Sequence, residues 1–138
     1  LEVFHVTGTP ISILQQRQPP PYLITTFDLE RPRDELYARI DARIDHMIAD
    51  GLIEEVFSLV QNGYNWDLPS MSSLGYAEFR PLWEGSATQE SCVQQLKFNT
   101  HRFARKQGAW FRRLPNRHGL NASDTNLVEM ALEIVHRR

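Results

Sequence analysis

Two arginines one helical turn apart, Arg39 and Arg43, are the residues of this sequence best suited to bind a phosphate group. Residues four positions apart share one face of a helix, so the two guanidinium groups form a fork that can hold phosphate or diphosphate. A structural role is the alternative, because Glu35 could pair with Arg39 and both aliphatic stems could pass along a core. Spacing alone favours the structural role.

A basic segment from Ser91 to Ser123 is the second candidate, because it contains no acidic residue. Cations along a helix can neutralise successive phosphates of a nucleic acid, and Phe98 among them could stack on an unpaired base. Solvated helix faces usually mix both signs of charge, so the absence of acids favours a binding surface. Charge and periodicity by themselves still leave a solvated face as the simpler interpretation. The cations are Lys97, Arg102, Arg105, Lys106, Arg112, Arg113 and Arg117.

Gly75 and Tyr76 form a weaker third candidate, because they follow two serines and could begin a helix with free amide groups that suit a phosphate. A plain helix start is the simpler interpretation. The five histidines are scattered, and none has a second ligand at metal spacing. No nucleophile with an adjacent base is identified.

The charged residues are unevenly distributed along the sequence, although the net charge is small. The net charge is −2 and the pI is about 6.2. Nine acidic residues nevertheless fall between Asp28 and Glu55, so the basic segment can present a positive face. The single Cys92 cannot form an internal disulfide, which favours a reducing cytosolic setting. No apolar run is long enough to span a bilayer, and no charged-then-apolar leader is present, so we expect no membrane partner.

The elements that must position these residues are short in the first part of the chain. We expect a helix end, a second short helix, an extended proline-rich connector and one strand. The helix end is Leu1–Val6, closed by a left-handed Gly8. The second helix has Thr9 as its cap and Pro10 as its first residue, and it runs to about Gln16. The connector is Gln18–Pro21, and the strand is Tyr22–Phe27.

Helices dominate the rest of the sequence. The first starts at Pro32 and ends near Ala49, with an apolar stripe at Leu36, Ile40, Ile44, Met47 and Ile48. Gly51 ends or kinks it before a continuation through Ile53, Val56, Phe57 and Val60 that stops at Asn62–Gly63. A loop at residues 64–73 and a short helix ending at Trp83 follow.

The longest helix is expected from a Thr88 cap to about Leu114, before Pro115. Its apolar arc consists of Leu96, Thr100, Phe103, Ala104, Gln107, Trp110 and Phe111. Residues 116–123 are irregular, with room for a short strand. A last helix is expected after Asp124 or Thr125, with Leu127, Met130, Ile134 and Val135 inward and Arg137–Arg138 at its end. The chain is therefore mainly α-helical with one clear strand, and we expect the partners of that strand in an upstream part of a longer protein.

Five segments occur in the order typical of one family. They are Leu1–Val3 with Thr7–Ser12, Leu36–Arg43, Met47–Gly51 with Glu55–Val56, Ser73–Tyr76, and Arg102–Arg112. On these segments the chain resembles the C-terminal part of bacterial tRNA dimethylallyltransferase, also called tRNA isopentenylpyrophosphate transferase. The match covers most of Leu1 to Arg113, and the last helix carries little of it.

The resemblance implies an α/β parent fold of the P-loop kinase-like class. Residues 1–138 would be the C-terminal part of its core catalytic domain, without the phosphate-binding half and the anticodon-binding insertion. Enzymes of the family transfer a dimethylallyl group from dimethylallyl diphosphate to N6 of the adenine next to the anticodon. The resemblance also implies Mg²⁺ with ligands outside this chain, the anticodon stem-loop of tRNA as partner, and a cytoplasmic monomer. The isolated chain is expected to be inactive.

The resemblance also assigns roles to individual residues. Arg39 matches the family arginine that reaches the diphosphate, and Arg43 is a second candidate for it. Residues that match tRNA-contacting segments are Ser73, Leu74, Gly75, Tyr76, Arg102, Arg105, Lys106, Gln107, Trp110 and Arg112. Two departures put single tRNA contacts in doubt: Ala77 replaces a basic residue, and Ala109 replaces a threonine.

Two other classes of function fit the residues. One is a non-catalytic RNA-binding helical module that uses the basic helix. The other is a helical protein-interaction domain that uses exposed aromatic side chains and binds no nucleic acid. A salt-dependent affinity for tRNA separates the second class from the other two.

Overall fold

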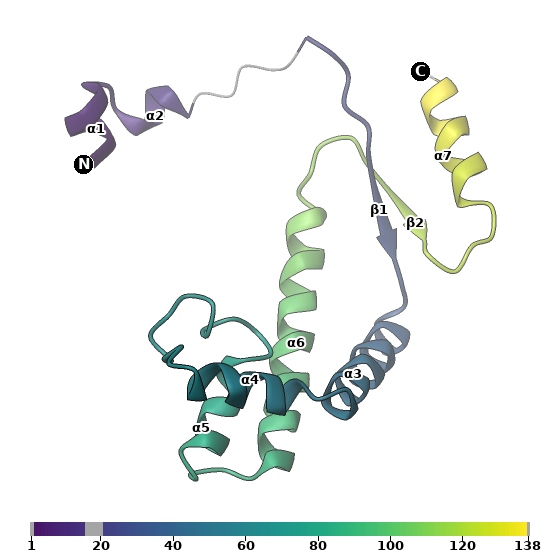
Figure 1. Ribbon diagram of the computed structural model, residues 1–138. Coiled ribbons are helices and arrows are strands. Elements are labelled where there is room, and N and C mark those ends of the chain that lie inside the picture. The colour runs from purple at the N-terminus through teal and green to yellow at the C-terminus, as the bar shows by residue number, and fades with distance from the viewer. Residues whose placement is uncertain (1, 16–20, 138) are drawn as a thin grey trace.

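The computed structural model describes residues 2–15 and 21–137 and is mainly helical (Figure 1). This confirms the expected mainly α-helical architecture with one or two strands. The helices are α1 (Glu2–Thr7), α2 (Ile11–Leu14), α3 (Arg33–Ala49), α4 (Leu52–Gln61), a 3-10 turn η1 (Ala77–Phe79), α5 (Arg80–Trp83), α6 (Gln89–Phe111) and α7 (Leu127–His136). The strands are β1 (Thr26–Glu30) and β2 (Arg117–Asn121).

The two strands form a parallel sheet in which Thr26 pairs with Arg117 and Glu30 with Asn121. The expected strand at residues 22–27 was therefore placed too early. A strand extends only where a partner supplies hydrogen bonds, and the pairing begins where the Thr26 amide donates to the Asn116 carbonyl over 3.1 Å. The expectation that β1 lacks a partner in this chain is also wrong, because β2 is that partner.

Helix boundaries agree with the sequence where a specific residue sets them. Gly8 and Gly51 have φ values of 67° and 99°, which suit glycine, and Gly51 separates α3 from α4. The Thr88 side chain accepts a hydrogen bond from the Ser91 amide at the start of α6.

The starts of two other helices differ from the expected ones. Pro10 lies before α2 rather than inside it, so Thr9 is not its cap. Asn126 precedes α7 without a side-chain cap, so neither Asp124 nor Thr125 caps it. The predictions for Leu1, residues 16–20 and Arg138 lie outside the described residues.

The core lies where α3, α4, η1 and the start of α6 meet (Figure 1). Val56 of α4 and Phe79 of η1 are fully buried, and Ile44 of α3 and Leu96 of α6 lie in the same cluster. The expected stripe of α3 is confirmed here, since Ile40, Met47 and Ile48 also pack against this cluster.

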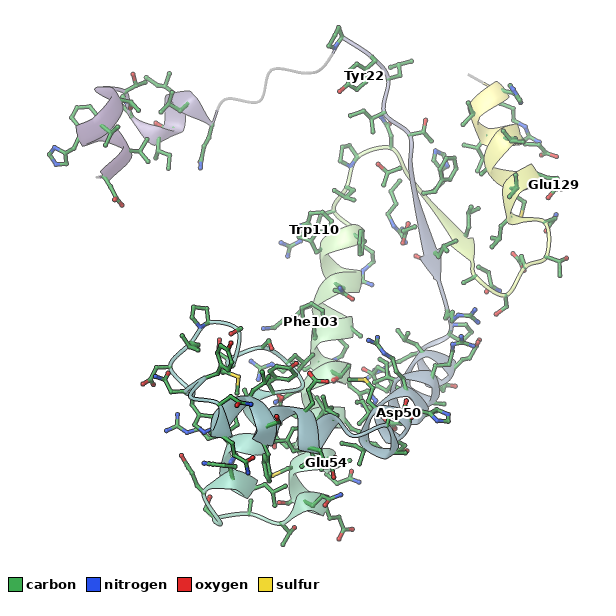
Figure 2. The ribbon with its side chains drawn as sticks, in the orientation of Figure 1. Tyr22, Asp50, Glu54, Phe103, Trp110 and Glu129 are labelled. Carbon is green, nitrogen blue, oxygen red and sulfur yellow. The ribbon has the colours of Figure 1, made fainter. Side chains whose placement is uncertain are left out.

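The apolar arc of α6 is buried only in the first half of the helix. Phe103 and Trp110 are 52% and 59% exposed, and Figure 2 shows both on the part of α6 that extends beyond α4. The apolar side of α7 also differs from the expectation. Leu127, Met130 and Ile134 are half-buried, whereas Val135 is 48% exposed, so its inward placement is wrong.

Candidate functional site

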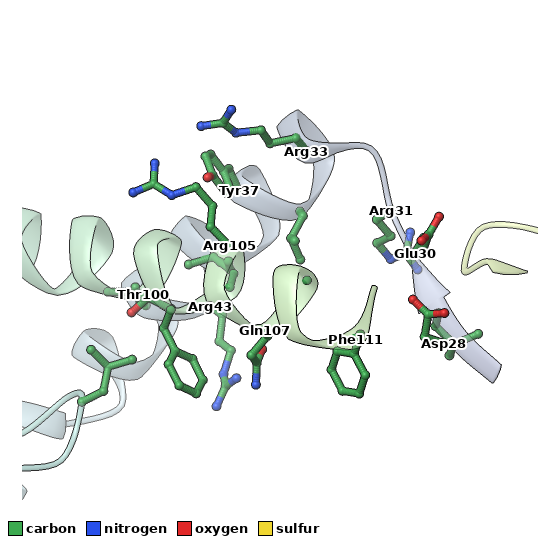
Figure 3. A pocket seen from close by; sticks show the side chains of 18 of the residues that line it. Asp28, Glu30, Arg31, Arg33, Tyr37, Arg43, Thr100, Arg105, Gln107 and Phe111 are labelled. Carbon is green, nitrogen blue, oxygen red and sulfur yellow. The ribbon is translucent and has the colours of Figure 1, made fainter. Parts of the chain in front are cut away.

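A groove of about 1160 Å³ lies between β1, α3 and the second half of α6 (Figure 3). Its apolar lining includes side chains from all three elements, among them Phe27, Leu36, Tyr37, Ile40, Phe103 and Phe111. Its charged lining consists of two carboxylates, Asp28 and Glu30, and six arginines: Arg31, Arg33, Arg43, Arg105, Arg112 and Arg117. Arg31 and Arg117 are paired with carboxylates, and the other four have no acidic partner among the described residues. Such a groove suits a ligand that carries both apolar and anionic groups.

Arg39 and Arg43 lie on one face of α3, as their spacing predicts. Both line a second, open hollow of about 530 Å³ together with His46, and Arg43 also lines the groove. Figure 3 shows Arg43 projecting to the same side of the groove as Gln107 and Phe111. Both arginines are exposed on the surface of α3.

The ion pair between Glu35 and Arg39, one part of the structural alternative, does not form. Glu35 makes its ion pair with Arg31 instead, and Arg31 also donates to the Ala122 carbonyl over 3.2 Å. Within residues 2–15 and 21–137, Arg39 and Arg43 have no acidic partner within ion-pair distance. The two guanidinium groups are therefore available to an anion.

Two aspartates of α3 contact basic side chains of α6. Lys97 Nζ lies 2.6 Å from Asp45 Oδ1, and His101 Nε2 lies 2.9 Å from Asp41 Oδ1. The second contact is an ion pair only when His101 is protonated, and its N–H is not directed at the carboxylate. The His101 ring also stacks on Tyr37, with centroids 4.0 Å apart. Lys97 of the basic segment is thus used to hold α6 against α3.

The last cation of the basic segment is also used by the fold. Arg117 of β2 donates to Asp28 Oδ2 of β1 over 2.9 Å and forms an ion pair with Glu30. Its role is to hold the two strands together beside the groove.

Five cations of α6 and the turn after it remain exposed and form what we call the basic surface. They are Arg102, Arg105, Lys106, Arg112 and Arg113. No acidic group of the described residues lies within ion-pair distance of them. Because charges of one sign are left together at the surface, the potential there is positive although the chain is slightly acidic overall.

Gln107 and Trp110, also predicted to bind tRNA, do not belong to the basic surface. Gln107 lines the groove, and Trp110 packs edge-on against Phe111 at a centroid distance of 5.1 Å. Arg105 and Arg112 of the basic surface also line the groove, so the two surfaces adjoin along α6.

The predicted segment Ser73–Tyr76 forms a tight turn at the edge of the groove. Leu74 and Gly75 line the groove, and Gly75 is buried with φ 103°. Its amide donates to Glu78 Oε2 over 2.9 Å, so this amide is not free for a phosphate. Glu78 reaches back three residues to this amide, at the spacing of a capping box, just before η1.

Two carboxylates fix this turn to the neighbouring helices. Glu78 Oε1 also accepts from Asn99 Nδ2 of α6 over 2.8 Å. The Tyr76 hydroxyl donates to Glu55 of α4, which together with burial raises the pKa of Tyr76. The exposed residues Ser73 and Leu74 are therefore held between α4 and α6.

Sequence reasoning missed Glu78, Glu55, Tyr37 and the two aspartates of α3 as supports of the site. Three of them, Glu78 and the two aspartates, stand at spacings from which the contact could have been predicted. Glu78 stands three residues after Gly75, the capping-box spacing. Asp41 and Asp45 repeat the four-residue spacing of Lys97 and His101, as two helices joined by paired charges would.

No cluster of three or more histidine, cysteine, aspartate and glutamate side chains that could hold a metal is found in residues 2–15 and 21–137. None of the described helices is both long enough and apolar enough to cross a membrane.

Comparison with known sequences gives one consistent result. A model of the IPP transferase family matches residues 1–114. A tRNA dimethylallyltransferase of Herpetosiphon aurantiacus is 66% identical over 135 residues, which is 98% of this chain and 43% of that protein. The enzyme of the same name from Chloroflexus aggregans is 60% identical over 116 residues, covering 84% of this chain and 39% of that protein.

Solved structures resemble the chain in the same way. A tRNA isopentenylpyrophosphate transferase from Bacillus halodurans superposes with a TM-score of 0.75 at 31% identity, over 92% of this chain and 41% of that one. The tRNA delta(2)-isopentenylpyrophosphate transferase of Staphylococcus epidermidis gives 0.72 at 30% identity, over 99% and 46%. The chain spans less than half the length of these relatives.

Proposed function

Because the chain belongs to the IPP transferase family, we propose that the complete protein transfers a dimethylallyl group from dimethylallyl diphosphate to tRNA. The acceptor is N6 of the adenine next to the anticodon. The observation that carries the proposal is the pair Arg39 and Arg43, which share one face of α3 and have no acidic partner among the described residues. A prenyl diphosphate has both the apolar and the anionic character that the neighbouring groove suits.

The transfer exchanges one bond for another at the first carbon of the prenyl group. The N6 lone pair forms the new carbon–nitrogen bond, the carbon–oxygen bond breaks, and diphosphate leaves with the electron pair. N6 then loses a proton to a base, for which we assign no residue of this chain. Negative charge grows on the departing diphosphate, so fixed cations stabilise the transition state more than the ground state. Arg39 has this role in the proposal, and Arg43 is the second contact.

Mg²⁺ is part of the proposal for the complete protein, where it would neutralise charge on the diphosphate. Among the described residues there is no cluster of three or more histidine, cysteine, aspartate and glutamate side chains that could hold a metal. In the proposal its ligands come from outside these residues, and no step of the transfer depends on them.

Binding of the tRNA anticodon stem-loop is assigned to α6 and the turn before it. The target adenine must leave its stack to reach the prenyl group, so the enzyme must hold the surrounding nucleotides. The basic surface supplies phosphate contacts through Arg102, Arg105, Lys106 and Arg112. In the proposal, Leu74, Gly75 and Gln107 contact the tRNA at the edge of the groove, and Ser73, Tyr76 and Trp110 contact it outside the groove lining.

The remaining features of the proposal concern the complete protein. They are a P-loop kinase-like α/β fold, a monomeric state and a cytoplasmic location. The parallel pairing of β1 with β2 supports the α/β class, because parallel sheets belong to folds with helices on their faces.

The test is an assay of the complete protein with dimethylallyl diphosphate, Mg²⁺ and a tRNA that has adenine next to its anticodon. Mass spectrometry of the digested tRNA should show one dimethylallyl group on that adenosine. A tRNA with guanosine at the same position is the control and should stay unmodified. Salt-sensitive tRNA binding without any transfer would instead favour the non-catalytic RNA-binding module.

A further inference from the structure

Phe98 is an exposed aromatic residue on the solvent side of α6, beside the basic surface. At about 100° per residue, Phe98 points in nearly the same direction as Arg105, with Arg102 about 40° away. With a rise of about 1.5 Å per residue, Arg102 is about 6 Å and Arg105 about 10 Å along the axis from Phe98. Phe98 therefore continues the basic surface toward the start of the helix.

The packing of α6 explains why this side is free. Lys97 and His101, the neighbours of Phe98 on one flank, turn toward α3 and contact Asp45 and Asp41. On the other flank, Asn99 turns toward η1 and donates to Glu78. Phe98 itself is 56% exposed and does not belong to the hydrophobic core cluster.

We propose that Phe98 is a stacking site for an unpaired base of the bound tRNA, with Arg102 and Arg105 on the adjoining phosphates. The inference rests on the proposed function, which supplies the tRNA. An aromatic ring offers a flat face to any base, and the two cations that follow Phe98 along α6, about 6 Å and 10 Å away, can bind the backbone phosphates next to that base.

Charge decides between RNA and a protein partner for this face. On the free side of α6 the cations near Phe98 are Arg102 and Arg105, which have no acidic partner in the described part of the chain, and the segment from Ser91 to Ser123 has no acid. Desolvating several like charges under a protein would be costly unless the partner were strongly acidic. A nucleotide chain presents the matching pattern, with flat apolar bases joined by anionic groups.

The experiment measures the affinity of the complete protein for a fluorescein-labelled tRNA by anisotropy at several salt concentrations. Phe98→Ala should weaken binding about five-fold or more, with an unchanged slope of log K against log salt, because no charge is lost. Phe98→Trp should keep the affinity, while Phe98→Leu, which retains bulk but no aromatic face, should weaken it.

Two further variants serve as controls. Arg105→Gln removes a phosphate contact and should lower the slope of log K against log salt by about 0.7 to 0.9. Tyr64→Ala removes another exposed aromatic side chain outside α6 and should have no effect.

Two results would overturn the inference while leaving the proposed function intact. One is salt-dependent tRNA binding in which Phe98→Ala matches the unchanged protein within about two-fold. The other is full affinity with Phe98→Leu, which would show a general apolar contact in place of stacking. Failure of the unchanged protein to bind tRNA would overturn the inference together with the proposed function.

Discussion

His101 of α6 stacks face to face on Tyr37 of α3, with ring planes 3° apart and centroids separated by 4.0 Å. The Arg33 guanidinium lies 5.0 Å from the centre of the same tyrosine ring. This stack and the two aspartate pairs beside it fix the position of α3 on α6. The arginine pair and the basic surface are on these two helices, so their relative placement depends on this contact.

The first prediction concerns the energy of that stack. In a double-mutant cycle with Tyr37→Leu and His101→Ala, the two changes should show a coupling of about 0.5 to 1.5 kcal/mol in the free energy of unfolding. Urea denaturation of the complete protein measures it. A control cycle combines Tyr37→Leu with Arg80→Ala. Arg80 of α5 pairs with Glu84 just after that helix, so the two changes should be additive. Additivity in the first cycle would mean that the rings do not interact.

The second prediction concerns Glu78, which accepts hydrogen bonds from the Gly75 amide and from Asn99. Glu78→Ala leaves a buried amide without its acceptor, so we expect a loss of about 1 to 3 kcal/mol in the free energy of unfolding. The KM for tRNA should rise, because Ser73 and Leu74 are displaced, while the KM for dimethylallyl diphosphate should stay constant. Glu84→Ala, which removes an exposed surface ion pair with Arg80, should change neither KM. An unchanged KM for tRNA in Glu78→Ala would disconnect the turn from RNA binding.

The third prediction follows from the raised pKa of Tyr76. The hydroxyl donates to Glu55, and this hydrogen bond favours the neutral phenol. A group whose pKa is raised by folding adds stability below its unfolded pKa of 10.0, and that stability is lost as pH rises through the folded pKa. The unchanged protein should therefore lose stability more steeply than Tyr76→Phe above about pH 10. Denaturation midpoints across that range measure the effect, and parallel curves would show that the hydrogen bond does not persist.

The helices of the core could be predicted because their signals are local. The periodic apolar residues of α3, the left-handed Gly51 and the Thr88 cap each act within a few residues, and all three were confirmed. The shared face of Arg39 and Arg43 follows from the same helical spacing.

The parts that were missed depend on contacts between distant segments. Propensity favours a strand at residues 22–25, which include the aromatic Tyr22 and the β-branched Ile24 and Thr25, yet the strand begins at Thr26 because β2 supplies the hydrogen bonds only from there. β2 itself includes Gly119 and three polar or charged residues, a composition that no local rule favours. The availability of Arg39 also depends on a choice between two spacings, since Glu35 pairs with Arg31 four residues before it and not with Arg39 four residues after it.

The most direct test of the account is the single-turnover rate of prenyl transfer by the complete protein with Arg39→Ala. Loss of a fixed cation at the departing diphosphate should lower this rate about 100-fold or more, and Arg39→Lys should recover part of it. The control is Arg137→Ala, which should keep the full rate. It removes an exposed cation just after α7 that pairs with Glu133. A rate for Arg39→Ala equal to that of the unchanged protein would remove Arg39 from the diphosphate site and contradict the account.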